Sequence, residues 1–336
     1  MPLARARGSP CAPLRAADMI TPVLHVEHVH KRYGDLVAVN DVSFDVPRGQ
    51  CFGLLGPNGA GKTTTISMAC GILRPDAGRV EIGGEGVTSD TSPAKRRIGY
   101  VPQELALYEE LSAADNLRLF GSMYGLRGAA LRGRIDEALR LTGLSDRATE
   151  PVSRYSGGMK RRLNIGAAVL HEPELLVFDE PTVGVDPQSR NAIFETLKSL
   201  QAAGKTIVYT THYMEEVERL CDRVAIMDHG AIVANDTLDG LRRLLPASDE
   251  VGVELDPGSM SDGDGWVGEL RSAVGGVRQA RIKGTTLTLD VDQLVRDVPA
   301  VLGWLEGRKV GVCGVASRRA TLEDVFLHLT GRTLRD

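Results

Sequence analysis

The sequence predicts an α/β protein in two parts: a large domain built on a parallel sheet, and a small α+β domain after it. Residues 50–55 form a continuous apolar run, typical of a strand buried on both faces, and a glycine-rich loop and a helix-like segment follow it. Further on, the short apolar runs LLVFDE, TIVYTTH and RVAIMD are separated by amphipathic segments at residues 188–203 and 213–221. This is the rhythm of parallel strands joined by helices. A polar stretch from residue 246 then marks a linker.

Length and composition exclude several classes of protein. The chain has 336 residues, 42% of them apolar and 25% charged, with 40 Lys and Arg against 44 Asp and Glu. This length suits two domains, and the balanced charge argues against nucleic acid as a partner. No stretch approaches the roughly 20 consecutive apolar residues of a membrane-spanning helix. The five cysteines form no C-x-x-C pair, which favours a reducing cytosol over a disulfide framework or a zinc site.

The N-terminal residues 1–22 are expected to form a disordered tail. They are rich in Arg, Ala and Pro and lack the apolar core of a secretory signal. Because a strand-like pattern starts directly after Met19, translation could begin there rather than at Met1.

The large domain is expected to cover residues 23–244. Its first segment, residues 23–46, carries two alternating, half-exposed strand patterns. Another strand pattern, RVEIGG, follows the helix after the glycine-rich loop. Residues 104–160 then show helical spacing with Ala, Leu and Arg and no strand signal, which predicts an inserted helical subdomain.

The small domain is expected to cover residues 250–336. Its pattern is strand, helix, strand, strand, helix, strand, which is compatible with a ferredoxin-like sandwich. An amphipathic helix at the end of the chain is expected to dock this domain shut. Its apolar face consists of Leu322, Val325, Phe326 and Leu329.

A phosphate-binding loop follows the first buried strand. The segment matches G-x-x-x-x-G-K-[ST] between a strand and a helix, which is the context this pattern requires. Its glycines let successive backbone N–H groups face phosphate oxygens, and the helix N-terminus adds partial positive charge. Lys62 is expected to reach the β- and γ-phosphates, and Thr63 to hold Mg²⁺. The loop consists of Gly56, Pro57, Asn58, Gly59, Ala60, Gly61, Lys62, Thr63 and Thr64.

Two acidic residues end the apolar strand LLVFDE. Asp179 is expected to bind Mg²⁺ through water, and Glu180 to orient or deprotonate the attacking water. An apolar strand that ends in two acids is weak evidence alone, since solvated acids are common there. Together with the phosphate-binding loop it indicates a nucleotide hydrolase.

Further motifs make the chain resemble ABC-type ATPases over about residues 23–240. They occur in the order that this family requires, which implies the fold of a P-loop ABC-type ATPase cassette. They are the A-loop aromatic Tyr33, the Q-loop Gln103, the signature Ser156, Gly157 and Gly158 in YSGGM, the D-loop Asp186 in VGVD, and the switch histidine His212.

The resemblance also implies roles for these residues, and each role suits the residue type. Tyr33 offers a π face for adenine, and the amide of Gln103 can ligate Mg²⁺ or water. The signature precedes a helix and, in the family, holds the γ-phosphate of the ATP bound to a partner subunit. His212 can hydrogen-bond the γ-phosphate. Read alone, the tyrosine, glutamine or histidine would be an ordinary core or surface residue.

The chain departs from the common family pattern in the signature and in the D-loop. Tyr155 stands where the signature LSGGQ has Leu, and Met159 where it has Gln. The hydrophobic anchor is therefore altered, and one polar side chain near the nucleotide is absent. The D-loop reads VGVD where SALD is common, which keeps Asp186.

The C-terminal ATLEDVFLHLTGRTLRD, the signature and the D-loop are similar to those of daunorubicin-resistance-type ABC-2 exporter ATPases. This implies an ATP-hydrolysing exporter subunit that binds ATP and Mg²⁺, forms a homodimer, and works with a separate ABC-2-type integral membrane permease. It would lie in the cytoplasm at the inner face of the cell membrane. The alternatives are a soluble ABC-type ATPase with a non-transport partner, and a nucleotide-binding regulator without turnover, which the presence of both Glu180 and His212 disfavours.

Overall fold

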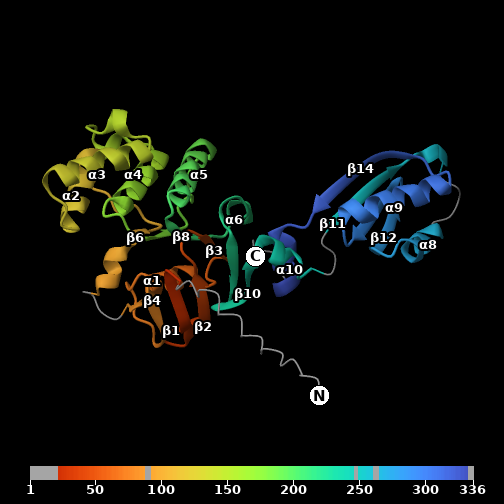
Figure 1. The fold of residues 1–336 in the computed structure, drawn as a ribbon, viewed down its shortest axis with the longest axis horizontal. Coiled ribbons are helices and arrows are strands. Elements are labelled where there is room, and N and C mark those ends of the chain that lie inside the picture. The colour runs from red at the N-terminus through yellow and green to blue at the C-terminus, as the bar shows by residue number, and fades with distance from the viewer. Residues whose placement is uncertain (1–21, 88–91, 246–248, 260–264, 332–336) are drawn as a thin grey trace, which may run out of the picture.

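The fold is that of a computed structural model, which describes residues 22–87, 92–245, 249–259 and 265–331. The strands form three sheets, two in a large N-terminal body and one in a small body at the other end of the molecule (Figure 1). The expected tail at residues 1–22 lies, apart from its last residue, outside the described residues, as do both candidate start sites, Met1 and Met19.

The central sheet has six strands in the order β10-β9-β3-β8-β7-β6. Neighbours from β9 to β6 run parallel, and β10 is antiparallel to β9. The short apolar runs of the sequence therefore do form one parallel sheet, and the carboxyl ends of β3, β7 and β8 lie side by side. The strands are β3 (Cys51–Leu55), β6 (Ile98–Val101), β7 (Leu175–Asp179), β8 (Thr206–Thr211), β9 (Arg223–Asp228) and β10 (Ala231–Thr237).

A second, antiparallel sheet packs beside the first in the order β2-β1-β4-β5. Its strands β1 and β2 are longer than the two patterns expected in residues 23–46. The rings of Phe44 and Phe52 stack with centroids 5.0 Å apart and tie β2 to β3. The strands are β1 (Leu24–Tyr33), β2 (Leu36–Val46), β4 (Ala77–Ile82) and β5 (Glu85–Gly86).

Three helices of the large body, α2, α4 and α5, start at a residue whose side chain caps the helix. Ser156 accepts a hydrogen bond from the Met159 N–H at the start of α4, and Asp186 accepts one from the Ser189 N–H at the start of α5. The expected helical subdomain contains α2 and α3, while α4 continues beyond residue 160 towards β7. The helices are α1 (Lys62–Ala69), α2 (Ala113–Met123), α3 (Gly128–Leu141), α4 (Gly157–Val169), α5 (Pro187–Ala202) and α6 (Met214–Leu220).

The described residues also include short 3₁₀ helices. They are η1 (Pro93–Arg97), η2 (Ser145–Arg147), η3 (Val152–Arg154) and η4 (Pro257–Ser259).

The small body has the predicted strand and helix order. All of its strand pairs are antiparallel, in the order β12-β13-β11-β14, which is that of a ferredoxin-like sandwich. It has its own core, in which Trp266 and Trp304 pack with ring centroids 5.8 Å apart. Its elements are β11 (Asp249–Leu255), α8 (Trp266–Ala273), β12 (Val277–Lys283), β13 (Thr286–Val291), α9 (Leu294–Gly307) and β14 (Val312–Arg319).

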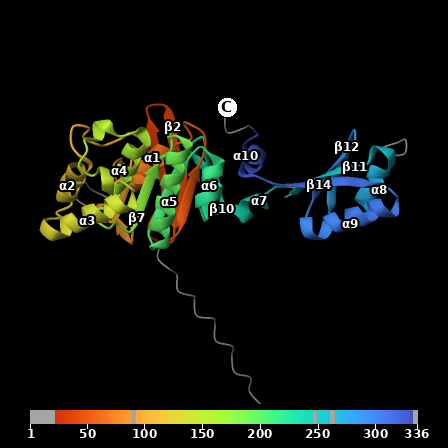
Figure 2. The same cartoon turned by 90° about the horizontal axis from the view of Figure 1, so that it is seen from above.

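The last helix, α10 (Leu322–Thr330), returns to the large body and packs against α6 and α7 (Leu238–Arg242) (Figure 2). A capping box formed by Thr321 and Asp324 starts it. Its buried side chains Leu322, Val325 and Phe326 belong to the core of the large body. The expectation that this helix docks the small domain shut is therefore wrong, because its apolar face is buried against the large domain.

Two hydrogen bonds hold the start of α10 against the large body. The Arg242 Nε donates to the Ala320 carbonyl at 3.0 Å, and the Leu322 N–H donates to Glu218 on α6 at 3.2 Å. The chain thus leaves the large body after α7 and re-enters it beside the same helix.

Candidate active site

The phosphate-binding loop joins β3 to α1 at the carboxyl edge of the central sheet. Two of its glycines have no room for a side chain. A Cβ at Gly56 would lie 2.3 Å from the Met227 carbonyl oxygen, and one at Gly61, where φ is 100°, would lie 2.4 Å from that of Ala38. The glycines are therefore required by close backbone approach from two other strands.

Beside this loop is an open cavity of about 490 Å³. Its walls come from the loop, the β1–β2 hairpin, the Q-loop residue, the end of β7 and the β9–β10 turn. The lining residues are Tyr33, Leu36, Val37, Ala38, Asn58, Gly59, Gly61, Lys62, Thr63, Thr64, Gln103, Glu180, His229 and Gly230.

Lys62 lies at the base of the cavity and is only 5% exposed. Its Nζ donates to the carbonyls of Gly56 at 2.7 Å and Pro57 at 3.0 Å, and lies 3.1 Å from the Glu180 carboxylate. The predicted phosphate-binding cation and the predicted base are thus in direct contact, although 118 positions separate them in the sequence (180 − 62).

Asp179 accepts hydrogen bonds from two threonine hydroxyls. Thr63 donates to its Oδ1 at 3.3 Å and Thr210 at 2.8 Å. Burial raises the pKa of this carboxyl, although the two hydrogen bonds oppose that shift. The predicted metal ligands Thr63 and Asp179 are therefore brought together, and the role of Thr210 was not predicted from the sequence.

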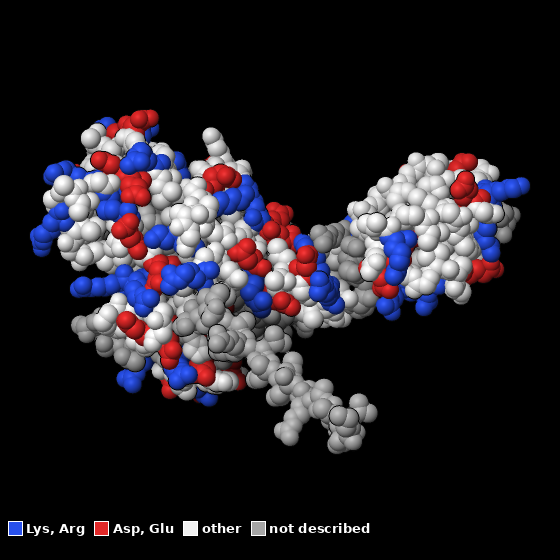
Figure 3. Space-filling view, in the orientation of Figure 1, with Lys and Arg blue, Asp and Glu red and all other residues white. Residues whose placement is uncertain are grey.

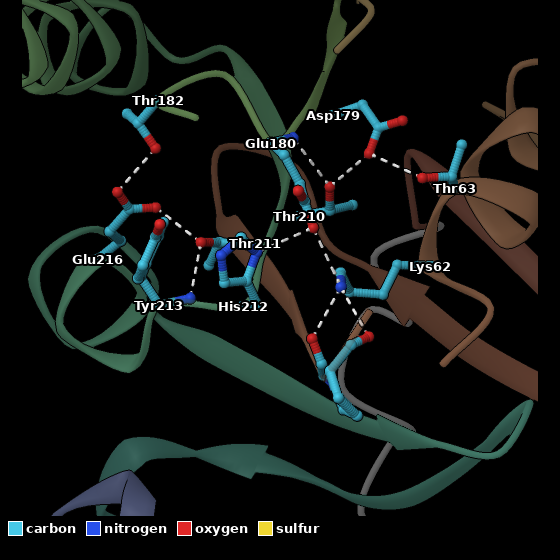
Figure 4. A network of polar contacts seen from close by, with 12 residues as sticks. Lys62, Thr63, Asp179, Glu180, Thr182, Thr210, Thr211, His212, Tyr213 and Glu216 are labelled. Carbon is cyan, nitrogen blue, oxygen red and sulfur yellow. Dashed lines mark hydrogen bonds and ion pairs between the residues drawn. The ribbon is translucent and has the colours of Figure 1, made fainter. Parts of the chain in front are cut away.

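Glu180 has a left-handed backbone, with φ at 45°. Its N–H donates to the Thr210 carbonyl at 3.2 Å and contacts the hydroxyl of the same residue at 3.1 Å. Its carboxylate lies 3.3 Å from His212 Nδ1 as well as next to Lys62 (Figure 4). This strained position aims the carboxylate at the loop and at the switch histidine together.

Tyr33, which is 51% exposed, also lines the cavity, as do the exposed side chains of Leu36 and Val37. These apolar neighbours and the β9–β10 turn residue His229 were missed by sequence reasoning. The turn is brought there by a hydrogen bond from the Gly230 N–H to the Ala60 carbonyl at 3.0 Å, a contact with no local sequence signal.

Gln103 also lines the cavity, and Arg161 holds the backbone around it. The buried guanidinium donates to the Pro102 carbonyl at 2.8 Å and to the Gln103 carbonyl at 2.6 Å. Arg161 lies on α4, which begins at the signature, so the signature helix and the Q-loop are fixed to each other. Sequence reasoning did not single out this arginine.

The signature and the D-loop residue form a second group, away from the cavity. Ser156 and Asp186 cap neighbouring helices, and none of Ser156, Gly157, Gly158 and Asp186 is among the lining residues. The backbone hydrogen bond from Ser189 lowers the pKa of Asp186. A Cβ at Gly158 would lie 2.1 Å from the Ser189 hydroxyl, so the two segments touch.

The fold and this site define a nucleotide-binding protein of the phosphate-loop class. A glycine-rich loop, a lysine, a hydroxyl, two carboxylates and a histidine meet at adjacent strand ends, which are the parts of a nucleoside triphosphate hydrolase. None of the described helices has the length and apolar character needed to cross a membrane.

Comparison with known proteins narrows the class. Residues 39–183 match the family described as ABC transporter. The chain is 43% identical to the linearmycin resistance ATP-binding protein LnrL of Bacillus subtilis, covering 94% of this chain and 100% of that protein. It is 40% identical to the Nod factor export ATP-binding protein I of Ralstonia nicotianae, covering 94% of this chain and 96% of that protein. Identity to the daunorubicin resistance ATP-binding protein DrrA3 of Streptomyces coeruleorubidus is 38%, covering 93% of this chain and 97% of that protein.

Solved structures of ABC ATP-binding proteins also match the fold of this chain. An ATP-binding subunit of an ABC transporter superposes with a TM-score of 0.61 at 36% identity, covering 66% of this chain and 92% of that one. A dimeric ATP-binding cassette in a post-hydrolysis state with ADP and Pi gives a TM-score of 0.58 at 25% identity, covering 64% of this chain and 98% of that one.

The chain belongs to the ABC transporter family, as an ATP-binding and ATP-hydrolysing subunit of the exporter type.

Proposed function

We propose that two copies of this chain bind two ATP molecules between them and drive export through a separate ABC-2-type membrane permease. The observation that carries this proposal is the division of the site. On one protomer, the signature residues Ser156, Gly157 and Gly158 lie outside the cavity lined by the phosphate-binding loop. A two-fold interface between copies would bring them to the γ-phosphate of the ATP bound to the other copy.

Within each site, three side chains divide the chemistry. Lys62 binds the β- and γ-phosphates, and Glu180 orients or deprotonates the attacking water. His212 holds the γ-phosphate and keeps Glu180 in place through their 3.3 Å contact. Tyr33, which lines the same cavity, stacks on adenine, and Asp186 takes part in communication between the two sites.

Mg²⁺ suits the oxygen donors at this position. The hydroxyl of Thr63, the carboxylate of Asp179 and the amide of Gln103 are the hard oxygen ligands that this ion prefers. The bound ion would neutralise negative charge on the phosphates. We therefore assign Thr63, Gln103 and Asp179 to the metal site.

The permease would hold this subunit at the cytoplasmic face of the membrane. Positive and negative side chains alternate over the visible face of the large body rather than forming a field of one sign (Figure 3), which supports a protein partner over nucleic acid.

Linearmycin resistance, daunorubicin resistance and Nod factor export in the names of the relatives support export as the direction of transport.

ATP-driven dimerisation tests the shared site. The Glu180→Gln protein should change from monomer to dimer in size-exclusion chromatography when ATP is added, because bound ATP is retained. Adding Ser156→Arg should block the dimer, since a bulky side chain would occupy the γ-phosphate position. The exposed Ser145 provides the control substitution, Ser145→Arg. A dimer that forms equally well with Ser156→Arg would refute the shared site.

Separate measurement of binding and turnover tests the roles within one site. Lys62→Ala should weaken ATP binding severely, whereas Glu180→Gln should bind ATP normally and lose nearly all phosphate release. Rapid hydrolysis by the Glu180→Gln protein would remove Glu180 from the proposed role.

A further inference from the structure

The structure assigns a positioning role in ATP hydrolysis to a residue that no motif contains: we propose that buried Glu216 fixes the segment after Glu180 and the segment that carries His212 relative to each other. Glu216 lies on α6, behind the site rather than in the cavity. The inference rests on the proposed roles of Glu180 and His212.

The carboxylate of Glu216 accepts hydrogen bonds from hydroxyl groups on two segments of the chain. Thr182 donates to its Oε1 at 2.7 Å, and Thr211 donates to its Oε2 at 2.7 Å (Figure 4). Tyr209 donates to the same Oε2 at 2.9 Å. Thr182 follows Glu180 by two positions, whereas Tyr209 and Thr211 lie on β8 just before His212. The residue itself is only 2% exposed, so water does not compete for these bonds.

A third segment, the start of α5 after the D-loop, also reaches this carboxylate. Arg190 Nε lies 3.8 Å from Glu216 Oε1, and the guanidinium of the same residue lies over the Tyr213 ring at 5.5 Å. One carboxylate therefore contacts the turn after β7, the first turns of α5 and the end of β8.

These contacts constrain His212 from both sides. Thr211 donates its hydroxyl proton to Glu216 and accepts a hydrogen bond from the Tyr213 N–H at 2.9 Å. The ring of Tyr213 packs against the His212 ring with centroids 4.1 Å apart. Moving the Glu216 carboxylate would thus shift both neighbours of the histidine that contacts Glu180.

Packing alone does not explain a carboxylate here. Burying a charge is costly, and an apolar residue of similar size would fill the space without that cost. What an apolar residue could not supply is the fixed geometry of three directed hydrogen bonds. Since displacements of about 1 Å can slow catalysis about 100-fold, the bonds can act on turnover without touching ATP.

The test compares, in the full chain, an apolar variant of similar size with a neutral variant that keeps the shape of glutamate. Glu216→Leu fills the space without accepting hydrogen bonds, whereas Glu216→Gln keeps an acceptor for the hydroxyls. We expect kcat to fall at least about 10-fold in Glu216→Leu, with KM for ATP and the affinity for a fluorescent ATP analogue within about threefold of the native values. Glu216→Gln should restore most of kcat. Glu215→Ala, on the exposed side of α6, is the control.

Milder variants keep the proposal testable if Glu216→Leu does not fold. Thr182→Val and Thr211→Val each remove one donor, and their effects on kcat should be strongly non-additive because both act through one carboxylate. Native kcat in Glu216→Leu would overturn the proposal, as would equal losses in the Leu and Gln variants or additive effects of the two threonines.

Reference variants separate this failure from failure of the proposed site. Glu180→Gln and His212→Ala are measured in parallel. If they lose turnover while Glu216→Leu keeps it, only the positioning role falls. If they keep turnover, the proposed roles of Glu180 and His212 fall first.

Discussion

Tyr33 presents its ring at the mouth of the nucleotide cavity, next to exposed Leu36 and Val37. A half-exposed aromatic ring gains contact area when a base stacks on it. We expect Tyr33→Ala to weaken ATP binding about 10-fold and Tyr33→Phe to bind normally, because stacking needs the ring and not the hydroxyl. Titration of the Glu180→Gln background with ATP measures both. Unchanged affinity in Tyr33→Ala would show that the base binds elsewhere.

Tyr155, which departs from the usual leucine, is explained by its surroundings. The ring is buried in the core of the large body, and its hydroxyl donates to the Arg147 carbonyl at 2.7 Å. Tyrosine therefore keeps the apolar anchor and adds a hydrogen bond to the last residue of η2.

Removing that bond should lower stability without altering the nucleotide site. Tyr155→Phe should reduce the free energy of unfolding by about 1 kcal/mol, measured by urea denaturation. ATP affinity of the folded protein should be unchanged. A change in affinity at native stability would mean that the signature segment senses this hydroxyl directly.

Residues within continuous motifs were predictable, whereas their partners from other segments were not. Lys62 was predicted from the pattern of its loop, and Asp179 and Glu180 from an apolar strand that ends in two acids, taken together with that loop. Thr210, Arg161 and Glu216 were missed because their roles depend on which strands, helices and loops become neighbours in the fold. A threonine in a buried strand has no distinguishing sequence signal until β7 and β8 pair.

Among the elements, α10 stabilises a domain other than the one that precedes it. Phe326 is fully buried against the large body, whereas Leu327 on the same helix is 44% exposed. We expect Phe326→Ala to destabilise the large body by about 3–5 kcal/mol and Leu327→Ala to have little effect. Loss of ATP-dependent thermal stabilisation reports on the large body. Equal effects of the two substitutions would contradict the observed packing.

This packing also bears on truncation. All nucleotide motifs precede residue 245, so their positions alone predict that a chain cut there remains a folded ATP-binding domain. The cut would also remove α10 and expose the surface of α6 and α7. Element order was predictable from periodicity, but the destination of an amphipathic helix depends on which apolar surface remains uncovered.

The start of α9 should make the small body sensitive to acid. Hydrogen bonds from Arg296 and then from the Gln293 N–H lower the pKa of Asp297. A pKa below that of the unfolded chain, about 3.9, stabilises the fold above that pH, and this contribution is lost as pH falls through the folded pKa. Asp297→Asn should therefore lower the unfolding midpoint at pH 7, and the difference from the native protein should shrink below about pH 4.

Tryptophan emission measures this transition locally, because Trp266 and Trp304 both lie in the core of the small body. The native protein provides the control at each pH. A constant difference between the variants down to about pH 2 would mean that ionisation of Asp297 does not contribute.

At the scale of the whole molecule, the large and small bodies, each with its own apolar core, are joined through α7 and α10 (Figure 2). Only the large body contains the nucleotide cavity. On the Glu180→Gln background, ATP at 100 times its Kd should stabilise that body by about 2.7 kcal/mol and leave the tryptophan-detected transition of the small body unchanged. Calorimetry with parallel fluorescence follows both. A shift of both transitions together would show that the bodies unfold as one cooperative unit.

The route of the chain through α7 and α10 makes the small domain an insertion rather than an appendage. Arg242 on α7 donates to the carbonyl of Ala320, which lies just before α10. The place where the chain leaves the large body and the place where it returns are therefore bridged by one side chain. A short glycine-serine bridge could therefore replace residues 246–319 and leave α10 in place. Such an internal deletion removes the small domain alone, whereas a cut at the linker also removes a helix of the ATPase core. The same geometry would have allowed a complete domain to be inserted between α7 and α10, or deleted there, during evolution without disturbing the ATPase domain.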